Sequence, residues 1–189
     1  MQQLNQKLGA LALGVALAGL AQSQAAGLVN VDIYSGFADA GGGAPYSGLV
    51  GSFTSPDIMF ATDTGYNWHP FSMGSFGADI TGCIDVPADG AYTFTLDSDD
   101  GSILLIGGSP IIDNGGGHGP TVVSGTATLS AGKHPFEVQF FEDFGGPSGV
   151  DLTLPAGVSY TSCPDGGSSM ALLGGAMLLI GSLSRKLRA

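Results

Sequence analysis

Short segments in which apolar and polar residues alternate, separated by glycine and proline, constrain the fold of this chain most strongly. The segments are residues 76–86, 92–97, 136–140 and 150–154. A period of two directs successive side chains to opposite faces of a β-strand, and no long stretch shows a helical period. The middle of the chain therefore predicts one all-β domain, an antiparallel β-barrel or sandwich.

An apolar segment also lies at each end of the chain, and the first has the organisation of a secretory signal peptide. Met1–Lys7 is polar with one cation, Leu8–Ala21 is apolar, and small residues follow through Ala25. The apolar run is shorter than the roughly 20 residues that a membrane-spanning helix needs. We therefore expect signal peptidase to remove residues 1–25. An uncleaved membrane anchor is the alternative.

The second apolar segment, Met170–Leu183, is followed by Arg185, Lys186 and Arg188. A basic end of this kind stops translocation and keeps the tip in the cytoplasm. Counted from Gly166, the segment would form a short apolar helix of 18 residues. Such a helix is about 27 Å long and barely spans a bilayer. We expect it to insert transiently into the inner membrane.

The motif Pro164-Asp165-Gly166 stands just before this segment. With the apolar helix and the basic tip, residues 163–189 resemble the PEP-CTERM class of bacterial sorting signals, in the variant that reads Val-Pro-Asp-x-Gly-Ser. Cys163 stands where that variant has valine. The resemblance implies that an exosortase-type membrane enzyme removes the tail and that the protein reaches the cell surface or the exopolysaccharide matrix. An uncleaved tail would instead anchor the protein in the membrane.

The chain is acidic, with 16 aspartates and glutamates against 5 lysines and arginines. Lys133 is the only cation between the two end segments, so the exported part carries about −14 to −15. Nucleic acids and anionic lipids require clustered lysine and arginine, so the charge argues against both as partners. An excess of carboxylates suits a hard cation such as calcium. Solubility in a salty medium explains the bulk charge equally well.

Two cysteines, Cys83 and Cys163, both belong to the exported part of the chain. In an oxidising compartment two cysteines usually pair. We therefore expect a disulfide that closes a loop of about 80 residues and stabilises the domain by restricting the unfolded chain. A free Cys163, used for lipid or intermolecular attachment, is the alternative.

Four sequence blocks occur in order in the middle of the chain: TGCIDVP at 81–87, DSDDGS at 97–102, IIDNGGGHGP at 111–120 and LSAGKHP at 129–135. Together they resemble the protective-antigen-type β-barrel module, the PA14 domain, over about residues 28–154. That family occurs in toxins, adhesins, glycosidases and flocculins and is associated with carbohydrate binding. The resemblance implies that residues 26–162 form a PA14-like β domain that binds carbohydrate or exopolysaccharide.

Asp99 and Asp100 are adjacent carboxylates at a predicted loop tip. Successive side chains diverge, so both reach one ion only if their peptide bond is cis, which costs about 3–4 kcal/mol outside proline. In the lectin-like members of the family this aspartate pair is cis and binds calcium, which implies the same role here. The alternative is a plain hairpin turn between residues 92–96 and 103–106, because Asp-Gly is a strong turn signal.

A second loop must complete such a site, because calcium takes about 6–8 oxygen ligands. The lectin-like members supply an asparagine from a later loop, whereas the corresponding residues 142–149 contain none. We expect Asp143 to take that place. Asn114 and His118, in the glycine-rich block, are further candidates for ligand contact.

The sequence has no pattern typical of an enzyme. Its three histidines, His69, His118 and His134, lack metal-ligand spacing, and no G-x-S-x-G motif occurs. Adjacent aspartates are also poorly placed to flank a glycosidic bond. The sequence therefore favours a non-catalytic carbohydrate-binding module with calcium at the aspartate pair. A structural component of the matrix or envelope without a specific ligand is the alternative.

Overall fold

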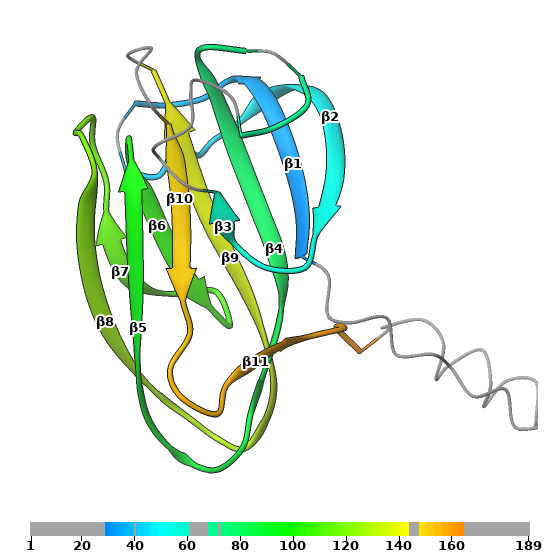
Figure 1. Cartoon of the computed structure of the whole chain (residues 1–189), viewed down its shortest axis with the longest axis vertical. Coiled ribbons are helices and arrows are strands. Elements are labelled where there is room, and N and C mark those ends of the chain that lie inside the picture. The colour runs from blue at the N-terminus through cyan, green and yellow to red at the C-terminus, as the bar shows by residue number, and fades with distance from the viewer. Residues whose placement is uncertain (1–28, 40, 61–67, 72, 144–147, 165–189) are drawn as a thin grey trace, which may run out of the picture.

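The computed structural model describes residues 29–39, 41–60, 68–71, 73–143 and 148–164, which form two antiparallel β-sheets (Figure 1). The larger sheet has the order β2 (Ser47–Ser55), β1 (Val29–Gly36), β4 (Phe76–Val86), β9 (Gly132–Glu142), β6 (Ser102–Ile106) and β7 (Ser109–Asn114), with β11 (Ser159–Thr161) also paired to β4. The smaller sheet has the order β3 (Met59–Phe60), β10 (Gly149–Thr153), β5 (Gly90–Asp99) and β8 (Thr121–Leu129). Among these residues, no helix is long and apolar enough to cross a membrane.

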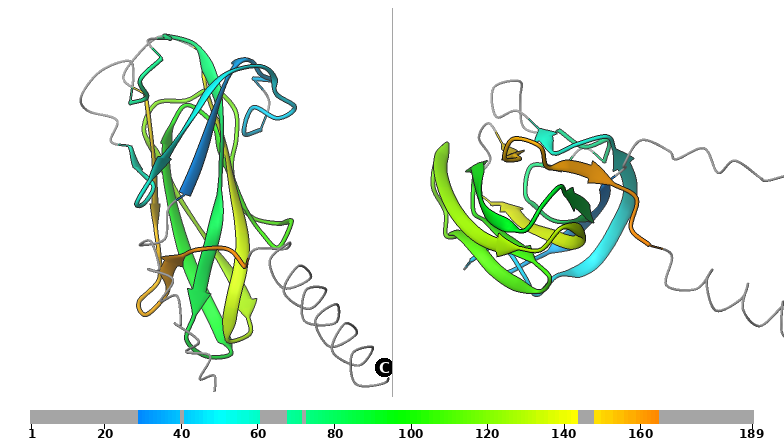
Figure 2. Two further views of the ribbon diagram at one scale, coloured as in Figure 1. Left: turned by 90° about the vertical axis from the view of Figure 1, so that its right-hand side faces the viewer. Right: turned by 90° about the horizontal axis from the view of Figure 1, so that it is seen from below.

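The two sheets face each other along the length of the molecule (Figure 2). The hydrogen-bonded path of the larger sheet ends at β2 and β7, and that of the smaller sheet ends at β3 and β8. Within the described residues, no backbone pairing connects β2 to β7 or β3 to β8. Neither sheet therefore closes into a barrel. The all-β prediction is confirmed in its sandwich form, and the alternative of a closed barrel is wrong.

The segments with alternating residues are strands β4, β5, β9 and β10, and their apolar side chains fill the space between the sheets. In β9, for example, Phe136, Val138 and Phe140 are buried while Glu137 and Gln139 are partly exposed. Removing apolar surface from water stabilises the fold by roughly 25 cal/mol per Å². The bulkiest fully buried apolar side chains are Phe76, Phe94, Phe140, Phe141, Ile33, Ile58, Ile80, Ile84, Leu96 and Leu104.

A disulfide between Cys83 and Cys163 fastens the end of the domain to the larger sheet. Their Cα atoms are 5.1 Å apart, and Thr161 of β11 pairs with Cys83 of β4 in the adjoining ladder. Cys163 is therefore part of the folded domain, and Pro164 follows it directly. The expected signal peptide (1–25), the expected C-terminal helix, Asp165 and Gly166 lie outside the described residues.

The chain changes sheets at the Asp99-Asp100-Gly101 sequence. Strand β5 belongs to the smaller sheet and β6 to the larger one, and the two strands do not pair with each other. The hairpin turn that Asp-Gly suggested is therefore wrong, and this sequence is a crossover at one end of the sandwich. Because β9 pairs with β6 and also ends there, the crossover lies beside the last residue of β9.

Candidate cation-binding site

Three carboxylates meet where β5 crosses to β6 and β9 ends. One oxygen from each of Asp99, Asp100 and Glu142 lies within 4.8 Å of the other two. Only 3% of Asp100 and 1% of Glu142 is exposed to solvent. Two oxygens bound to one calcium ion at about 2.3–2.6 Å are at most about 5 Å apart. The spacing of the three carboxylates is therefore compatible with one shared ion.

Backbone hydrogen bonds hold the Asp100 carboxylate between two later segments of the chain. The peptide bond between Asp99 and Asp100 is cis. The His118 N–H donates to Oδ1 of Asp100 at 2.9 Å, and the Asp143 N–H donates to Oδ2 at 3.1 Å. Each carboxylate oxygen has a further lone pair, so both oxygens remain able to bind a cation.

Glycines allow three loops to approach one another beside these carboxylates. A Cβ atom on Gly101 would lie 2.4 Å from the Phe141 ring and 2.7 Å from the carbonyl oxygens of both Gly41 and Gly116. The Gly116 N–H donates to the Gly41 carbonyl at 3.2 Å, and the Phe141 N–H donates to the Gly101 carbonyl at 3.0 Å. A side chain at Gly101 would push these segments apart.

The site is strongly acidic. Burial and then the adjacent Asp100 carboxylate raise the pKa of Asp99, and the nearby His118 opposes this effect. Lys133 is the only lysine or arginine in the described ranges, and its Nζ donates to the Ser162 carbonyl at 2.9 Å. No lysine or arginine of that part of the chain therefore balances the three carboxylates. A divalent cation would do so, because it favours the ionised form of each acid.

The third carboxylate belongs to Glu142, not to Asp143. The exposed side chain of Asp143 accepts a hydrogen bond from Ser75 Oγ at 2.9 Å, and Asp143 contributes only its backbone N–H to the site. The alternation of buried and exposed residues in β9 predicts that the Glu142 side chain faces inward. This residue continues the inward-facing series of Phe136, Val138 and Phe140, so its side chain turns into the sandwich.

Asn114, the last residue of β7, and His118, in the glycine-rich loop that follows it, support the site. The Asn114 amide donates to Ser98 Oγ and to the Thr121 carbonyl, each at 2.9 Å, and Ser98 Oγ lies 2.7 Å from Ser102 Oγ. The ring nitrogens of His118 lie 2.9 and 3.0 Å from two backbone carbonyl oxygens. Both side chains thus bind other parts of the chain, while the His118 backbone holds Asp100.

Comparison with known sequences gives one family. The sequence profile of the PA14 domain matches residues 35–166, which is more than two thirds of the chain. No curated protein matches the chain. The matched range includes all of the carboxylates described above.

Solved structures share the fold at low sequence identity. An anti-sigma factor domain-containing protein superposes with a TM-score of 0.59 at 22% identity, over 78% of this chain and 49% of that chain. The PA14 sugar-binding domain from an RTX adhesin gives 0.54 at 16% identity, over 74% and 96%. A β-glucosidase from Kluyveromyces marxianus gives 0.51 at 15% identity, over 72% and only 16%. This chain thus spans about half of the first protein and a small part of the third.

Proposed function

This chain belongs to the PA14 domain family, and on that premise we propose that it is a non-catalytic carbohydrate-binding module that holds calcium at Asp99, Asp100 and Glu142. The convergence of these three carboxylates from two chain segments carries the proposal. One protein with a similar fold is described as a sugar-binding domain from an adhesin, which supports carbohydrate as the ligand class.

The donor set fits calcium. All three side chains offer carboxylate oxygens, which hard cations prefer, and the site contains no thiolate because both cysteines form the disulfide. Calcium takes about 6–8 oxygen ligands, so three carboxylates leave positions for carbonyl oxygens and sugar hydroxyls. The bound ion would attract the sugar electrostatically. The carboxylates would hold the ion at the end of the sandwich.

Calorimetry tests the calcium proposal. The full-length chain, with its disulfide formed and stripped of metal with EDTA, is titrated with calcium chloride. We expect one saturable site that is lost in Asp99→Asn and Asp100→Asn but retained in Asp113→Asn. Asp113 is exposed, and its substitution changes the net charge equally. Absence of binding to the folded wild-type protein would overturn the proposal and favour a structural component of the matrix.

Carbohydrate binding is tested separately on a glycan array, with calcium and with EDTA. We expect binding only when calcium is present, and not in the Asp100→Asn variant. Calcium-independent glycan binding would place the sugar elsewhere on the molecule.

The non-catalytic part of the proposal is supported by the surroundings of two histidines, His69 and His134. Burial lowers the pKa of His69 to about 4, and its Nδ1 accepts a hydrogen bond from the Phe71 N–H at 3.1 Å. A ring nitrogen of His134 lies 2.8 Å from the Ser130 carbonyl. The third histidine, His118, does interact with Asp99, but its two ring nitrogens lie 2.9 and 3.0 Å from backbone carbonyl oxygens. Hydrolysis of aryl glycosides by the purified protein would contradict this part of the proposal.

We further propose that the protein is exported and then sorted to the cell surface or the extracellular matrix. The disulfide supports an oxidising compartment. Mass spectrometry of the protein from the producing cells tests this: we expect a chain that begins at Ala26 and lacks the basic C-terminal tip. A full-length intracellular chain would contradict export.

A further inference from the structure

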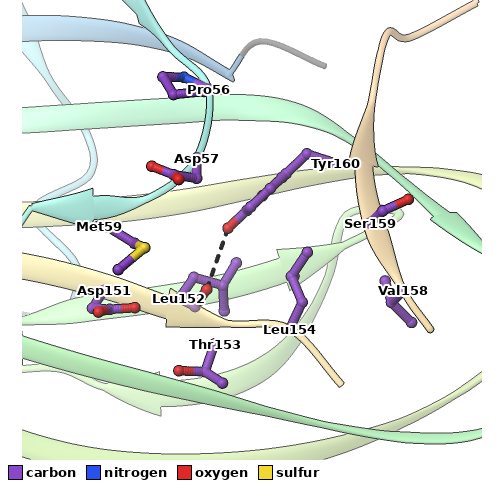
Figure 3. A pocket seen from close by; sticks show the side chains of 10 residues that line it. All are labelled: Pro56, Asp57, Met59, Asp151, Leu152, Thr153, Leu154, Val158, Ser159 and Tyr160. Atoms are coloured by element: carbon purple, nitrogen blue, oxygen red, sulfur yellow. Dashed lines mark hydrogen bonds between the residues drawn. The ribbon is translucent and has the colours of Figure 1, made fainter. Parts of the chain in front are cut away.

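A second candidate binding site lies between the edge of the smaller sheet and β11. This β3–β10–β11 groove has a volume of about 460 Å³ (Figure 3), within the roughly 300–1,000 Å³ of ligand pockets. Its lining includes Asp57, Met59, Asp151, Thr153, Val158 and Tyr160. It is separate from the three carboxylates of the cation site, none of which lines it.

The wall of the groove is fixed by contacts between the two sheets. The Tyr160 hydroxyl of β11 donates to the Leu152 carbonyl of β10 at 3.3 Å (Figure 3). The Tyr160 ring also packs against Phe136, with ring centroids 5.7 Å apart. Leu152 and Val158 are buried beneath the opening. The groove therefore has an apolar floor and an aromatic wall whose position the fold sets in advance.

The rim of the groove is acidic. Asp151 pairs across the ladders with Met59 on one side and with Asp97 on the other, and Asp57 lies just before β3. Burial first, and then Asp97 and Asp57, raise the pKa of Asp151. Both Asp57 and Asp151 also act on the hydroxyl of Tyr160, whose pKa is raised chiefly by burial. The two rim carboxylates and the Tyr160 hydroxyl therefore interact electrostatically with one another.

A cation that also has apolar character would match such a groove. None of the residues that line the groove is a lysine or an arginine. A guanidinium group is planar, weakly hydrated and able to stack on an aromatic ring while it hydrogen-bonds to carboxylates. The exposed side chain of Met59, with 66% of its surface accessible, can pack along the methylene stem of an arginine.

We propose that the β3–β10–β11 groove binds an arginine side chain of a partner protein, between the Asp57 and Asp151 carboxylates and over the Tyr160 ring. This site is independent of the proposed calcium site. It would give the domain a protein-docking surface in addition to the proposed carbohydrate-binding site.

Nuclear magnetic resonance titration of the full-length chain tests the proposal, with EDTA present so that the cation site is empty. The probe is Nα-acetyl-arginine methylamide, and its neutral counterpart is Nα-acetyl-citrulline methylamide. We expect the arginine probe to shift the amides of β10 and β11 saturably, and the citrulline probe to bind at least about tenfold more weakly. Equal binding of the two probes would overturn the proposal, as would shifts confined to the cation site.

Variants show whether the rim carboxylates carry the binding. We expect Asp57→Asn and Asp151→Asn each to weaken binding at least about fivefold. The control Asp39→Asn removes the same charge from an exposed loop residue and should leave binding unchanged. Thr153→Arg places a guanidinium in the groove from an exposed position of β10 and should block the probe even if the aspartate variants fold poorly. Unaltered binding in Thr153→Arg would sink the proposal.

Discussion

Asp100 accepts a hydrogen bond from the backbone N–H of Asp143, 43 residues later in the chain, at 3.1 Å. This bond joins the crossover between the sheets to the end of β9. As a result, the Glu142 carboxylate comes within 4.8 Å of those of Asp99 and Asp100. The acidic site therefore depends on a contact between two segments that are far apart in sequence.

The two neighbouring acids at the end of β9 should differ in their effect on calcium binding. We expect Glu142→Gln to weaken calcium affinity at least about tenfold, because it removes one of three carboxylate ligands. Asp143→Asn should change affinity less than about twofold, because its side chain contacts Ser75 and its N–H is retained. Calorimetry with calcium measures both. Equal losses in the two variants would mean that Asp143 is also a ligand.

Gly101 should be intolerant of a side chain. In Gly101→Ala the new Cβ would lie 2.4 Å from the Phe141 ring and 2.7 Å from two backbone carbonyl oxygens. We expect the free energy of unfolding to fall by about 2 kcal/mol or more, as for other overpacked sites. Chemical denaturation measures this.

Gly119 provides a matched control in the same region, because a Cβ atom on this residue would meet no atom within 4 Å apart from its chain neighbours. We expect Gly119→Ala to change stability by less than about 0.5 kcal/mol. If the two variants are equally stable, the close packing around Gly101 does not contribute as described.

Asp79 should make the domain less stable as the pH rises. Burial, followed by repulsion from Glu137 and Asp32, raises its pKa from 3.8 to about 6. The folded state therefore binds a proton more tightly than the unfolded state does. This contribution to stability is fully present below about pH 4 and is lost as the pH rises through about 6.

The Asp79→Asn variant isolates this effect. At pH 7 to 8 we expect it to be more stable than the wild type by about 1 kcal/mol, after allowing for solvent screening of a half-buried group. The difference should disappear near pH 4. Thermal unfolding across this range measures it, with Asp39→Asn as an exposed control. A constant difference at every pH would contradict the raised pKa.

Loss of the disulfide should destabilise the domain strongly. Cys83 and Cys163 are 80 residues apart, and closure of a loop of this size contributes about 4.5 kcal/mol in the chain-entropy model. We expect the Cys83→Ser, Cys163→Ser double variant to unfold at markedly lower denaturant concentration. The wild type measured with a reducing agent should behave in the same way. A change below about 1 kcal/mol would show that the unfolded chain gains little freedom.

Much of the fold was predictable because β-strands have a period of two. The alternation in β4, β5, β9 and β10 identified the residues that face the core. The same alternation, extended by one step beyond Phe140, identifies Glu142 as inward-facing. The prediction of Asp143 followed the family pattern in preference to this local signal, and the structure places Asp143 against Ser75.

Local periodicity and composition are enough to predict the all-β class, the core-facing residues and the acidic character of the chain. The assignment of β5 and β6 to different sheets, which makes Asp99-Asp100 a crossover and not a hairpin, follows only from the folded structure. Only the tertiary structure also brought Glu142 to the aspartate pair and Asp57 to Asp151. The physical reason is that strand pairing depends on how distant segments share one core, and an Asp-Gly turn is locally compatible with either connection.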